Sequence, residues 1–301
     1  MKNKMKKLSN EHMKSLPFKK LGKNVTISNN AKIKTPEKIC VGDNSVIGDH
    51  CELSGDIVIG KNTTLSSFVS IKGQHIRIGD GNYIGDGVQI LVNEFSLGDY
   101  SKIHNKSTLH GYKPLTIGHN AWVGQGTIID SIGGTTIGNN FGVGAYSQLW
   151  SHIRFGDPLA GCNYESDNPL VIGDDVWLVG HCIVSPVTIH DKAMALVGSI
   201  ITKDMEYNKI YGGSPAKDLT DKLKPQFTDN TIGDKREIMN KINLPAGIKL
   251  IEDDREISDD RISYFNILTR KYTKRNTDNE FNFMKELHAN LIKFVPMENL
   301  K

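Results

Sequence analysis

The sequence predicts an all-β solenoid, a parallel β-helix of about nine coils followed by a small C-terminal α/β appendage. The main observation is an aliphatic residue at every sixth position, as in Val41, Ile47 and Leu53. A helix repeats every 3.6 residues and a strand every two, so a six-residue period fits neither element alone. The period is typical of a β-helix, in which each hexapeptide forms one short face and three hexapeptides close one coil.

The spacing of the repeats defines the domain organisation. Most aliphatic triplets begin 17 to 20 residues apart, close to the 18 residues of three hexapeptides, but 35 residues separate Ile137 from Ile172. One coil must therefore carry a long excursion, which we place at residues 150–171. Stacked coils bury a continuous aliphatic column at each face, which a single coil cannot do. We expect the β-helix to span residues 21–219, after an N-terminal extension at residues 1–20.

The hexapeptide repeat ends near Ile201, and the rest of the chain has a different pattern. Residues 226–244 and 278–294 are patterned as helices, whereas residues 246–251 are patterned as a strand. We therefore expect residues 220–301 to form a small α/β C-terminal domain.

Composition and charge exclude several classes of protein. Hydrophobic residues make up 38% of the 301 residues, and no apolar run reaches the 18 residues of a membrane span. The net charge of +3 is too small to indicate nucleic acid binding. No apolar segment follows the basic N-terminus, and the four cysteines lack paired spacing. We expect a cytoplasmic protein with at most peripheral membrane contact, for which the basic run at residues 270–275 is the candidate.

The stretch from Pro169 to Leu219 carries a more specific pattern, in three pieces: IGDDVWLVG at 172–180, VGSIITKD at 197–204 and IYGGSPAK at 210–217. It resembles the signature of hexapeptide-repeat acyltransferases of the galactoside, maltose and xenobiotic O-acetyltransferase type. This resemblance implies a left-handed β-helix and a homotrimer. It also implies that acetyl-CoA, as acyl donor, binds between neighbouring coil stacks, with no metal expected.

The resemblance also implies an activity and a catalytic residue. The expected reaction is acetyl transfer to a sugar hydroxyl of a surface polysaccharide or glycoside, with N-acylation of a nucleotide-linked amino sugar as the alternative. In this family a histidine at the start of the excursion is the general base, and His152 is the only histidine of this excursion. A neutral imidazole suits the removal of a proton from the attacking hydroxyl or amine. Its orienting partner is left open between Asp157, Glu165, Asp167 and a carboxylate of another coil.

Further site residues follow from the same resemblance or from position in the repeat. Trp150, the first residue of the excursion, and His104 and His110, which each follow an aliphatic repeat residue and project outward, are candidates for the acceptor site. The residues expected to bind the acyl-CoA are Gly180, Gly198, Ser199, Lys203, Pro215, Ala216 and Lys217.

Two other classes of function share this fold. Zinc-dependent lyases of the carbonic anhydrase type hold their metal with three histidines, which here could be drawn from His75, His104, His110 and His119. Their spacing does not resemble that family, and the motif at residues 197–217 favours acyl transfer. A non-catalytic ice-binding solenoid needs a regular array of threonines along one face, whereas the outward residues here are mixed.

Overall fold

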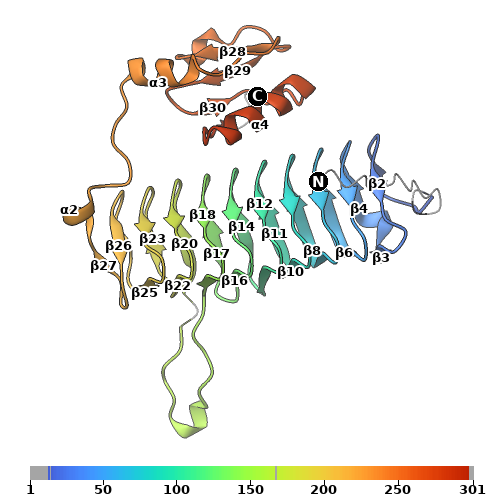
Figure 1. Cartoon of the computed structure of the whole chain (residues 1–301). Helices are drawn as coiled ribbons and strands as arrows, with labels where there is room; N and C mark the ends of the chain where they lie inside the picture. Colours follow the sequence, from blue (N-terminus) through green and yellow to red (C-terminus); the bar gives the residue numbers. More distant parts are fainter. Residues whose placement is uncertain (1–12, 14, 167, 298–301) are drawn as a thin grey trace, which may run out of the picture. The chain divides into compact units, whose positions relative to one another are not determined.

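The computed structural model describes residues 13, 15–166 and 168–297, so most of the predicted N-terminal extension lies outside the described residues. The chain divides into two compact units, residues 1–226 and residues 227–301. The first unit is a parallel β-solenoid, consistent with a left-handed β-helix, and its coils stack side by side along one axis (Figure 1). No helix among the described residues is long and apolar enough to cross a membrane.

The first face of the β-helix is an eleven-stranded sheet. Its strands are β2 (Thr26–Ile27), β5 (Val46–Ile47), β7 (Thr64–Leu65), β9 (Tyr83–Ile84), β12 (Lys102–Ile103), β15 (Trp122–Val123), β18 (Gly142–Val143), β21 (Trp177–Leu178), β24 (Met194–Ala195), β26 (Ile210–Gly212) and β27 (Lys217–Asp218). All pairs are parallel except β26 with β27, which form an antiparallel hairpin. Ten parallel strands stack here, so the prediction of about nine coils was too low.

The other two faces join into one sixteen-stranded sheet, because β6 and β8 run around the corner between them. The second face contains β3 (Lys32–Ile33), the first halves of β6 (Glu52–Ile59) and β8 (Ser70–Ile78), β10 (Gln89–Val92), β13 (Thr108–Gly111), β16 (Ile128–Asp130), β19 (Gln148–Leu149), β22 (Ile183–Val184) and β25 (Ile200–Ile201). The third face contains β1 (Lys20–Leu21), β4 (Ile39–Val41), the second halves of β6 and β8, β11 (Glu94–Leu97), β14 (Leu115–Ile117), β17 (Thr135–Ile137), β20 (Leu170–Ile172) and β23 (Thr188–Ile189).

The core is the aliphatic column that the six-residue period predicts. Ile103, Val123 and Val143 are stacked in register on the first face and are at most 1% exposed. Small inward residues such as Ser101 fill the space beside them, and their hydroxyls accept or donate hydrogen bonds between coils. Phe141 is the large exception and is fully buried.

The corner that leads into the first face is stabilised by a ladder of polar side chains. Asn120, Asn140 and Asp175 each adopt a positive φ near 60°, a conformation that Asn and Asp tolerate. The Asn120 amide donates to Asn140, and the Asn140 amide donates to Asp175, each at 2.9 Å. All three are buried. The ladder therefore satisfies side-chain groups that successive coils would otherwise bury without a partner.

The second unit is a small α/β fold, as predicted. Its four-stranded sheet has the order β28 (Ile248–Ile251), β29 (Ser263–Asn266), β30 (Lys271–Tyr272) and β31 (Val295–Pro296). Helices α3 (Ile232–Met239) and α4 (Asp278–Ala289) belong to this unit, and the short helix α2 (Thr220–Leu223) precedes it. Three short 3-10 helices complete the described elements: η1 (Pro36–Lys38), η2 (Pro158–Ala160) and η3 (Asp254–Glu256).

The ladder can be tested with a matched pair of variants. Asn140→Ala removes the central amide, and we expect the free energy of unfolding to fall by about 1–3 kcal/mol because buried partners lose hydrogen bonds. Asn62→Ala is the control: Asn62 has a φ of 52° at the equivalent corner position, and its side chain makes no hydrogen bond with the described residues. Chemical denaturation of both variants separates the hydrogen-bond contribution from the cost of the positive φ. Equal losses in the two variants would contradict the role of the ladder.

Candidate active site

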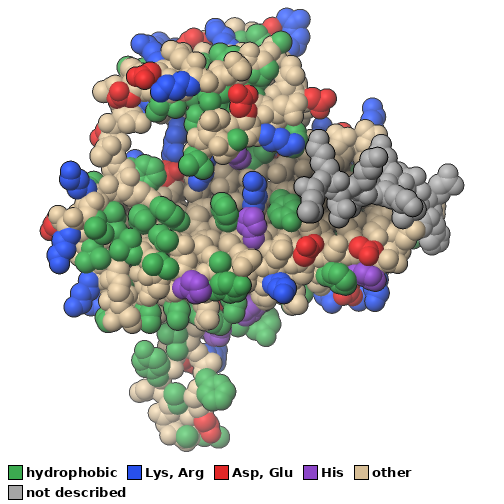
Figure 2. Space-filling view, viewed as in Figure 1, with side chains coloured by type: hydrophobic (Ala, Val, Ile, Leu, Met, Phe, Trp, Pro, Cys, Tyr) green, Lys and Arg blue, Asp and Glu red, His purple; other side chains and the backbone are tan. Residues whose placement is uncertain are grey.

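The excursion leaves the β-helix between β19 and β20, at the corner between the second and third faces, and projects away from the stack (Figure 1). A bridge between Ile153 and Ser166 closes its base, and η2 forms its tip. Hydrophobic side chains gather on its surface (Figure 2), among them Phe155, which is fully exposed. The excursion therefore carries apolar side chains that no described residue covers.

His152 lies at the root of the excursion and contacts a carboxylate of the preceding coil. Its Nδ1 atom is 2.8 Å from Oδ2 of Asp130, which directly follows the inward residue Ile129 of β16. The His152 side chain is 21% exposed, whereas the Asp130 side chain is fully buried. The pair thus joins a buried carboxylate to an imidazole that reaches the surface.

The surroundings of Asp130 keep it ionised. Burial raises the pKa of this carboxyl, but hydrogen bonds from Ser151 and His152 outweigh it and hold the pKa below its ordinary value. Ser151 donates its hydroxyl at 2.6 Å and its N–H at 3.0 Å to Oδ2, and the N–H of Ile132 lies 3.3 Å from Oδ1. An ionised carboxylate only accepts hydrogen bonds, so Nδ1 of His152 is the donor. Nε2 is then left with a lone pair that can accept a proton.

Asp130 was not among the partners that the sequence suggested by number. The named candidates Asp157 and Glu165 are on the excursion itself, where Asp157 caps η2 and Glu165 pairs with Arg154 at 3.3 Å. The third, Asp167, lies outside the described residues. The open alternative, a carboxylate of another coil, is the one that the structure shows. The repeat pattern in the sequence already pointed to Asp130. Ile129 is in register with Leu149, so Asp130 lies beside the position where the excursion begins.

The residues expected to bind the acyl acceptor fall into two groups. Trp150 and His110 lie beside the pair: the rings of Trp150 and His152 are 6.3 Å apart, and Nδ1 of His110 is 3.8 Å from Oδ1 of Asp130. His104 is on the first face instead, where its ring centroid lies 5.0 Å from that of Trp122. Burial, followed by the charge of Lys102, lowers the pKa of His104. His104 is therefore not part of the group around Asp130.

The glycines expected to bind the acyl donor occupy one corner, between the first and second faces. Gly198 donates its N–H to the carbonyl of Gly180 at 2.9 Å, so the two are stacked on successive coils. Both have a positive φ, 144° for Gly180 and 73° for Gly198. A Cβ added to Gly198 would meet no atom within 4 Å, so the space beside it is open to a ligand. The second face separates this corner from His152.

Ser199 does not fit a binding role, because its polar groups are used inside the β-helix. The side chain is fully buried, and its hydroxyl donates to the carbonyl of Leu196 at 2.6 Å. Its backbone N–H lies 3.3 Å from the same carbonyl, and its own carbonyl accepts from Ile183 at 3.0 Å. We therefore leave Ser199 out of the proposed site. The inward orientation of the Ser199 side chain follows from its position in the hexapeptide.

The remaining candidates surround the end of the β-helix. Lys203, Pro215 and Lys217 are exposed, and Ala216 is partly buried. Lys217 belongs to the β26–β27 hairpin, and the N–H of Ala216 donates to the carbonyl of Ile200 at 2.8 Å. This hydrogen bond holds the SPAK segment against β25 on the second face.

The histidines considered for zinc lie in different surroundings. His75 lies 3.7 Å from Asp56, whereas Nδ1 of His119 accepts from the N–H of Asp99 at 2.8 Å. Within residues 13, 15–166 and 168–297, no three His, Cys, Asp or Glu residues come together as a metal site. The zinc-lyase hypothesis therefore gains no support.

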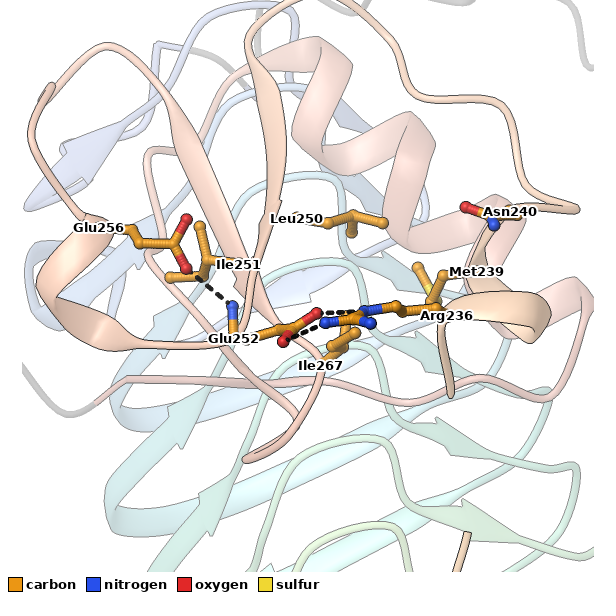
Figure 3. Close-up of a pocket in the computed structure, with 8 residues that line it drawn as sticks. All are labelled: Arg236, Met239, Asn240, Leu250, Ile251, Glu252, Glu256 and Ile267. Carbon is orange, nitrogen blue, oxygen red and sulfur yellow. Dashed lines mark hydrogen bonds and ion pairs between the residues drawn. The ribbon is translucent and has the colours of Figure 1, made fainter. Parts of the chain in front are cut away.

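A pocket of about 410 Å³ lies in the C-terminal unit, between α3 and β28 (Figure 3). Its charged side chains are engaged in the fold: Arg236 makes a bidentate ion pair with Glu252, at 2.6 and 2.8 Å. Glu256 accepts from the N–H groups of Glu252 and Asp253. Leu250 and Met239 contribute apolar surface. The pocket offers no reactive group comparable to His152.

The chain shares sequence similarity with bifunctional GlmU proteins. No family model matches it. It is similar to the bifunctional protein GlmU of Listeria welshimeri, with 28% identity over 200 residues that cover 60% of this chain and 39% of that protein. GlmU of Acinetobacter baumannii is 27% identical over 192 residues, which cover 58% of this chain and 37% of that protein. The chain thus spans about two fifths of the length of these relatives.

A solved structure extends the similarity to nearly the whole chain. The UDP-N-acetylglucosamine acyltransferase of Arabidopsis aligns with a TM-score of 0.52 over 92% of this chain and 95% of its own, at 13% identity. At this identity the alignment shows the fold alone. The protein therefore has the β-helix fold of the hexapeptide-repeat acyltransferases, as the motifs of the last coils implied.

The pKa of Asp130 predicts a dependence of stability on pH. Because the folded pKa lies below the unfolded value, the ionised carboxylate stabilises the fold at neutral pH, and this contribution is lost as the pH falls below about 4. At pH 7 the free energy of unfolding of Asp130→Asn should be about 1–3 kcal/mol lower than that of the wild type. This gap in the free energy of unfolding should narrow towards pH 3.

Chemical denaturation at several pH values measures this gap. Asp49→Asn is the control, since Asp49 also accepts from two side chains, Ser28 and Asn30, but is partly exposed and should contribute less. A gap for Asp130→Asn that stays constant with pH would contradict the assigned ionisation.

Proposed function

We propose that the protein is an acyl-CoA-dependent acyltransferase, most simply an acetyl-CoA:sugar O-acetyltransferase. The observation that carries this proposal is the hydrogen bond between buried Asp130 and part-exposed His152 at the root of the excursion. The motif of the last coils supports it, and so does the activity of the Arabidopsis protein that shares the fold, an acyltransferase. N-acylation of a nucleotide-linked amino sugar is the alternative for the acceptor.

His152 would act as the general base. Its Nε2 takes the proton of the acceptor hydroxyl as the acceptor oxygen bonds to the thioester carbon. Asp130 compensates the imidazolium that forms, as a buried carboxylate beside Nδ1 does in other histidine-dependent enzymes. The C–S bond then breaks, and His152 returns the proton to the sulfur of CoA. Neither step requires a covalent bond to the protein.

The acyl donor would bind along the corner of Gly180 and Gly198. Exposed Lys203 and Lys217 are suited to its phosphates, and Pro215 with Ala216 to the adenine. The second face, between this corner and His152, would carry the pantetheine arm towards the base. Trp150 and His110 would contact the acceptor, since both lie beside His152 or Asp130.

We also propose that the protein assembles as a homotrimer. Flat faces suit packing around a three-fold axis, and the excursion exposes Phe155 and Leu159, which another copy could cover. A neighbouring copy would then supply the second wall of the acyl-donor cleft. A cytoplasmic location remains part of the proposal, since acyl-CoA is a cytoplasmic metabolite.

The catalytic assignment is tested by His152→Ala. We expect turnover, measured as thiol release from acetyl-CoA with a panel of sugars, nucleotide sugars and amines, to fall by about 10²- to 10⁴-fold, the usual contribution of a general base. Affinity for CoA should stay near that of the wild type. His50→Ala, which removes an exposed histidine of an early coil, serves as the control. Full turnover in His152→Ala would remove the assignment.

The acyl-donor site is tested by Gly198→Ala. The added methyl group would enter the open space proposed for the donor, so we expect CoA affinity in calorimetric titration to fall by about tenfold or more. Gly247→Ala is a matched control, because Gly247 has a φ of 82° and its Cβ also meets no atom within 4 Å. Both variants carry the strain of a positive φ. Unchanged CoA affinity in Gly198→Ala would place the donor elsewhere.

A further inference from the structure

Ser151, the residue before His152, bonds to two residues of the preceding coil. It is fully buried at the root of the excursion. Its hydroxyl donates to Oδ2 of Asp130 at 2.6 Å, and its backbone N–H donates to the same oxygen at 3.0 Å. The hydroxyl oxygen in turn accepts from the N–H of Gly133 at 2.9 Å. A single buried hydroxyl therefore connects a backbone donor to the carboxylate that His152 contacts.

The two contacts fix the direction of the Ser151 hydroxyl proton. A backbone N–H only donates, so the hydroxyl oxygen must accept from Gly133. The ionised carboxylate of Asp130 only accepts, so the hydroxyl proton must point towards it. Any other rotation of the hydroxyl would leave the buried carboxylate without its shortest hydrogen bond, which is costly. The Ser151 hydroxyl is thus a donor dedicated to Asp130.

Gly133 is held where both ends of the excursion meet. A Cβ added to Gly133 would overlap the carbonyl oxygen of Ser151 and lie 2.9 Å from that of Asn168. Only glycine allows two other backbone segments to approach this closely. One residue further on, the carbonyl of Gly134 accepts at 3.0 Å from the N–H of Leu170, where the chain re-enters the β-helix. The N–H that orients the Ser151 hydroxyl therefore belongs to a closely packed part of the root.

Ser151 supplies most of the contacts that fix Oδ2 of Asp130. Of the three donors at this oxygen, two belong to Ser151 and the third is Nδ1 of His152, at 2.8 Å. At Oδ1, the N–H of Ile132 is 3.3 Å away, and Nδ1 of His110 lies at 3.8 Å, too far for a hydrogen bond. The carboxylate cannot turn about its Cβ–Cγ bond without losing both donors of Ser151. Nδ1 of His152 therefore meets Oδ2 at a fixed point.

We propose that Ser151 is a positioning residue of the acyl transfer: its hydroxyl, oriented by Gly133, fixes Oδ2 of Asp130 and, through it, the ring of His152. This inference rests on the proposed role of His152 as the base. A base must hold its reacting nitrogen within hydrogen-bond reach of the proton it removes, and a small displacement reduces the rate strongly. Ser151 is fully buried, so it acts on the reaction only through Asp130 and His152.

The test compares Ser151→Ala with Ser147→Ala in the full-length protein. Ser147 is also fully buried, and its hydroxyl also accepts from one N–H, that of Cys182 at 3.1 Å, but it donates to the carbonyl of Gly144 at 3.0 Å. In Ser151→Ala we expect kcat for thiol release to fall by about 10- to 100-fold, with KM for the acceptor and CoA affinity within about threefold of the wild type. Ser147→Ala should keep the wild-type kcat.

Two further variants separate positioning from a general loss of packing. Adding Ser151→Ala to Asp130→Asn should lower kcat no further than Asp130→Asn alone, because Ser151 acts through Asp130. In Ser151→Cys the thiol fills the space of the hydroxyl but is only a weak donor, so kcat should fall here too.

Stability provides a measurement that needs no activity. Burial raises the pKa of Asp130, and hydrogen bonds, first that of the Ser151 hydroxyl, lower it below its ordinary value. The ionised carboxylate therefore stabilises the fold at neutral pH, and this contribution is lost as the pH falls below about 4. The urea midpoint of Ser151→Ala should lie below that of the wild type at pH 7, with a deficit that narrows towards pH 3. The deficit of Ser147→Ala should stay constant with pH.

Three results would overturn the inference: equal kcat values in Ser151→Ala and Ser147→Ala, a further loss of kcat in the double variant, or a deficit of Ser151→Ala that stays constant with pH. The proposed function fails separately, if the wild type releases no thiol from acetyl-CoA with any acceptor. In that case the pH dependence of the Ser151→Ala deficit still decides whether the Ser151 hydroxyl holds the charge of Asp130.

Discussion

Stacking between coils is the constraint on which the rest of the structure depends. A single coil buries almost nothing, so each inward aliphatic residue is covered only by its equivalents in the neighbouring coils. Backbone hydrogen bonds run between coils in the same way, as from His104 to Val123. The same stacking buries polar groups at the corners, which is why Asn140 bonds to Asn120 on one side and Asp175 on the other.

Asp130 shows how this frame produces a reactive site. The residue occupies an outward position on β16, yet the following coil covers it, because Ser151 and His152 close over it where the excursion begins. Burial alone would favour the neutral carboxyl, and the three contacts at Oδ2 reverse that preference. The long excursion therefore does more than interrupt the repeat: its first residues convert an ordinary outward position into a buried anion beside an accessible imidazole.

Much of the fold could be predicted from the sequence, since the six-residue period directly reports the inward column. The coil number was too low because the last coil, with β26, lacks the full aliphatic triplet.

The contact between His152 and Asp130 crosses a coil boundary, and 22 residues separate the two in sequence. The aliphatic triplets report the register of β16 with β19, but they do not report that Ser151 and His152 bond to Asp130 where the excursion begins. Ser199 faces inward, as its place in the hexapeptide indicates, and its hydroxyl and backbone groups bond within the β-helix. The helix predicted at residues 278–294 ends at Ala289, so Leu291, which fits the helical period, lies beyond α4 and is 86% exposed.

The central claim is that acyl transfer takes place at His152, with the donor along the corner of Gly180 and Gly198. The most direct measurement is a crystal structure of the protein with CoA bound. It should show the thiol beside Nε2 of His152 and the phosphates near Lys203 or Lys217, with Asp130 still bonded to Nδ1. CoA bound away from the second face, or a thiol remote from His152, would contradict the claim.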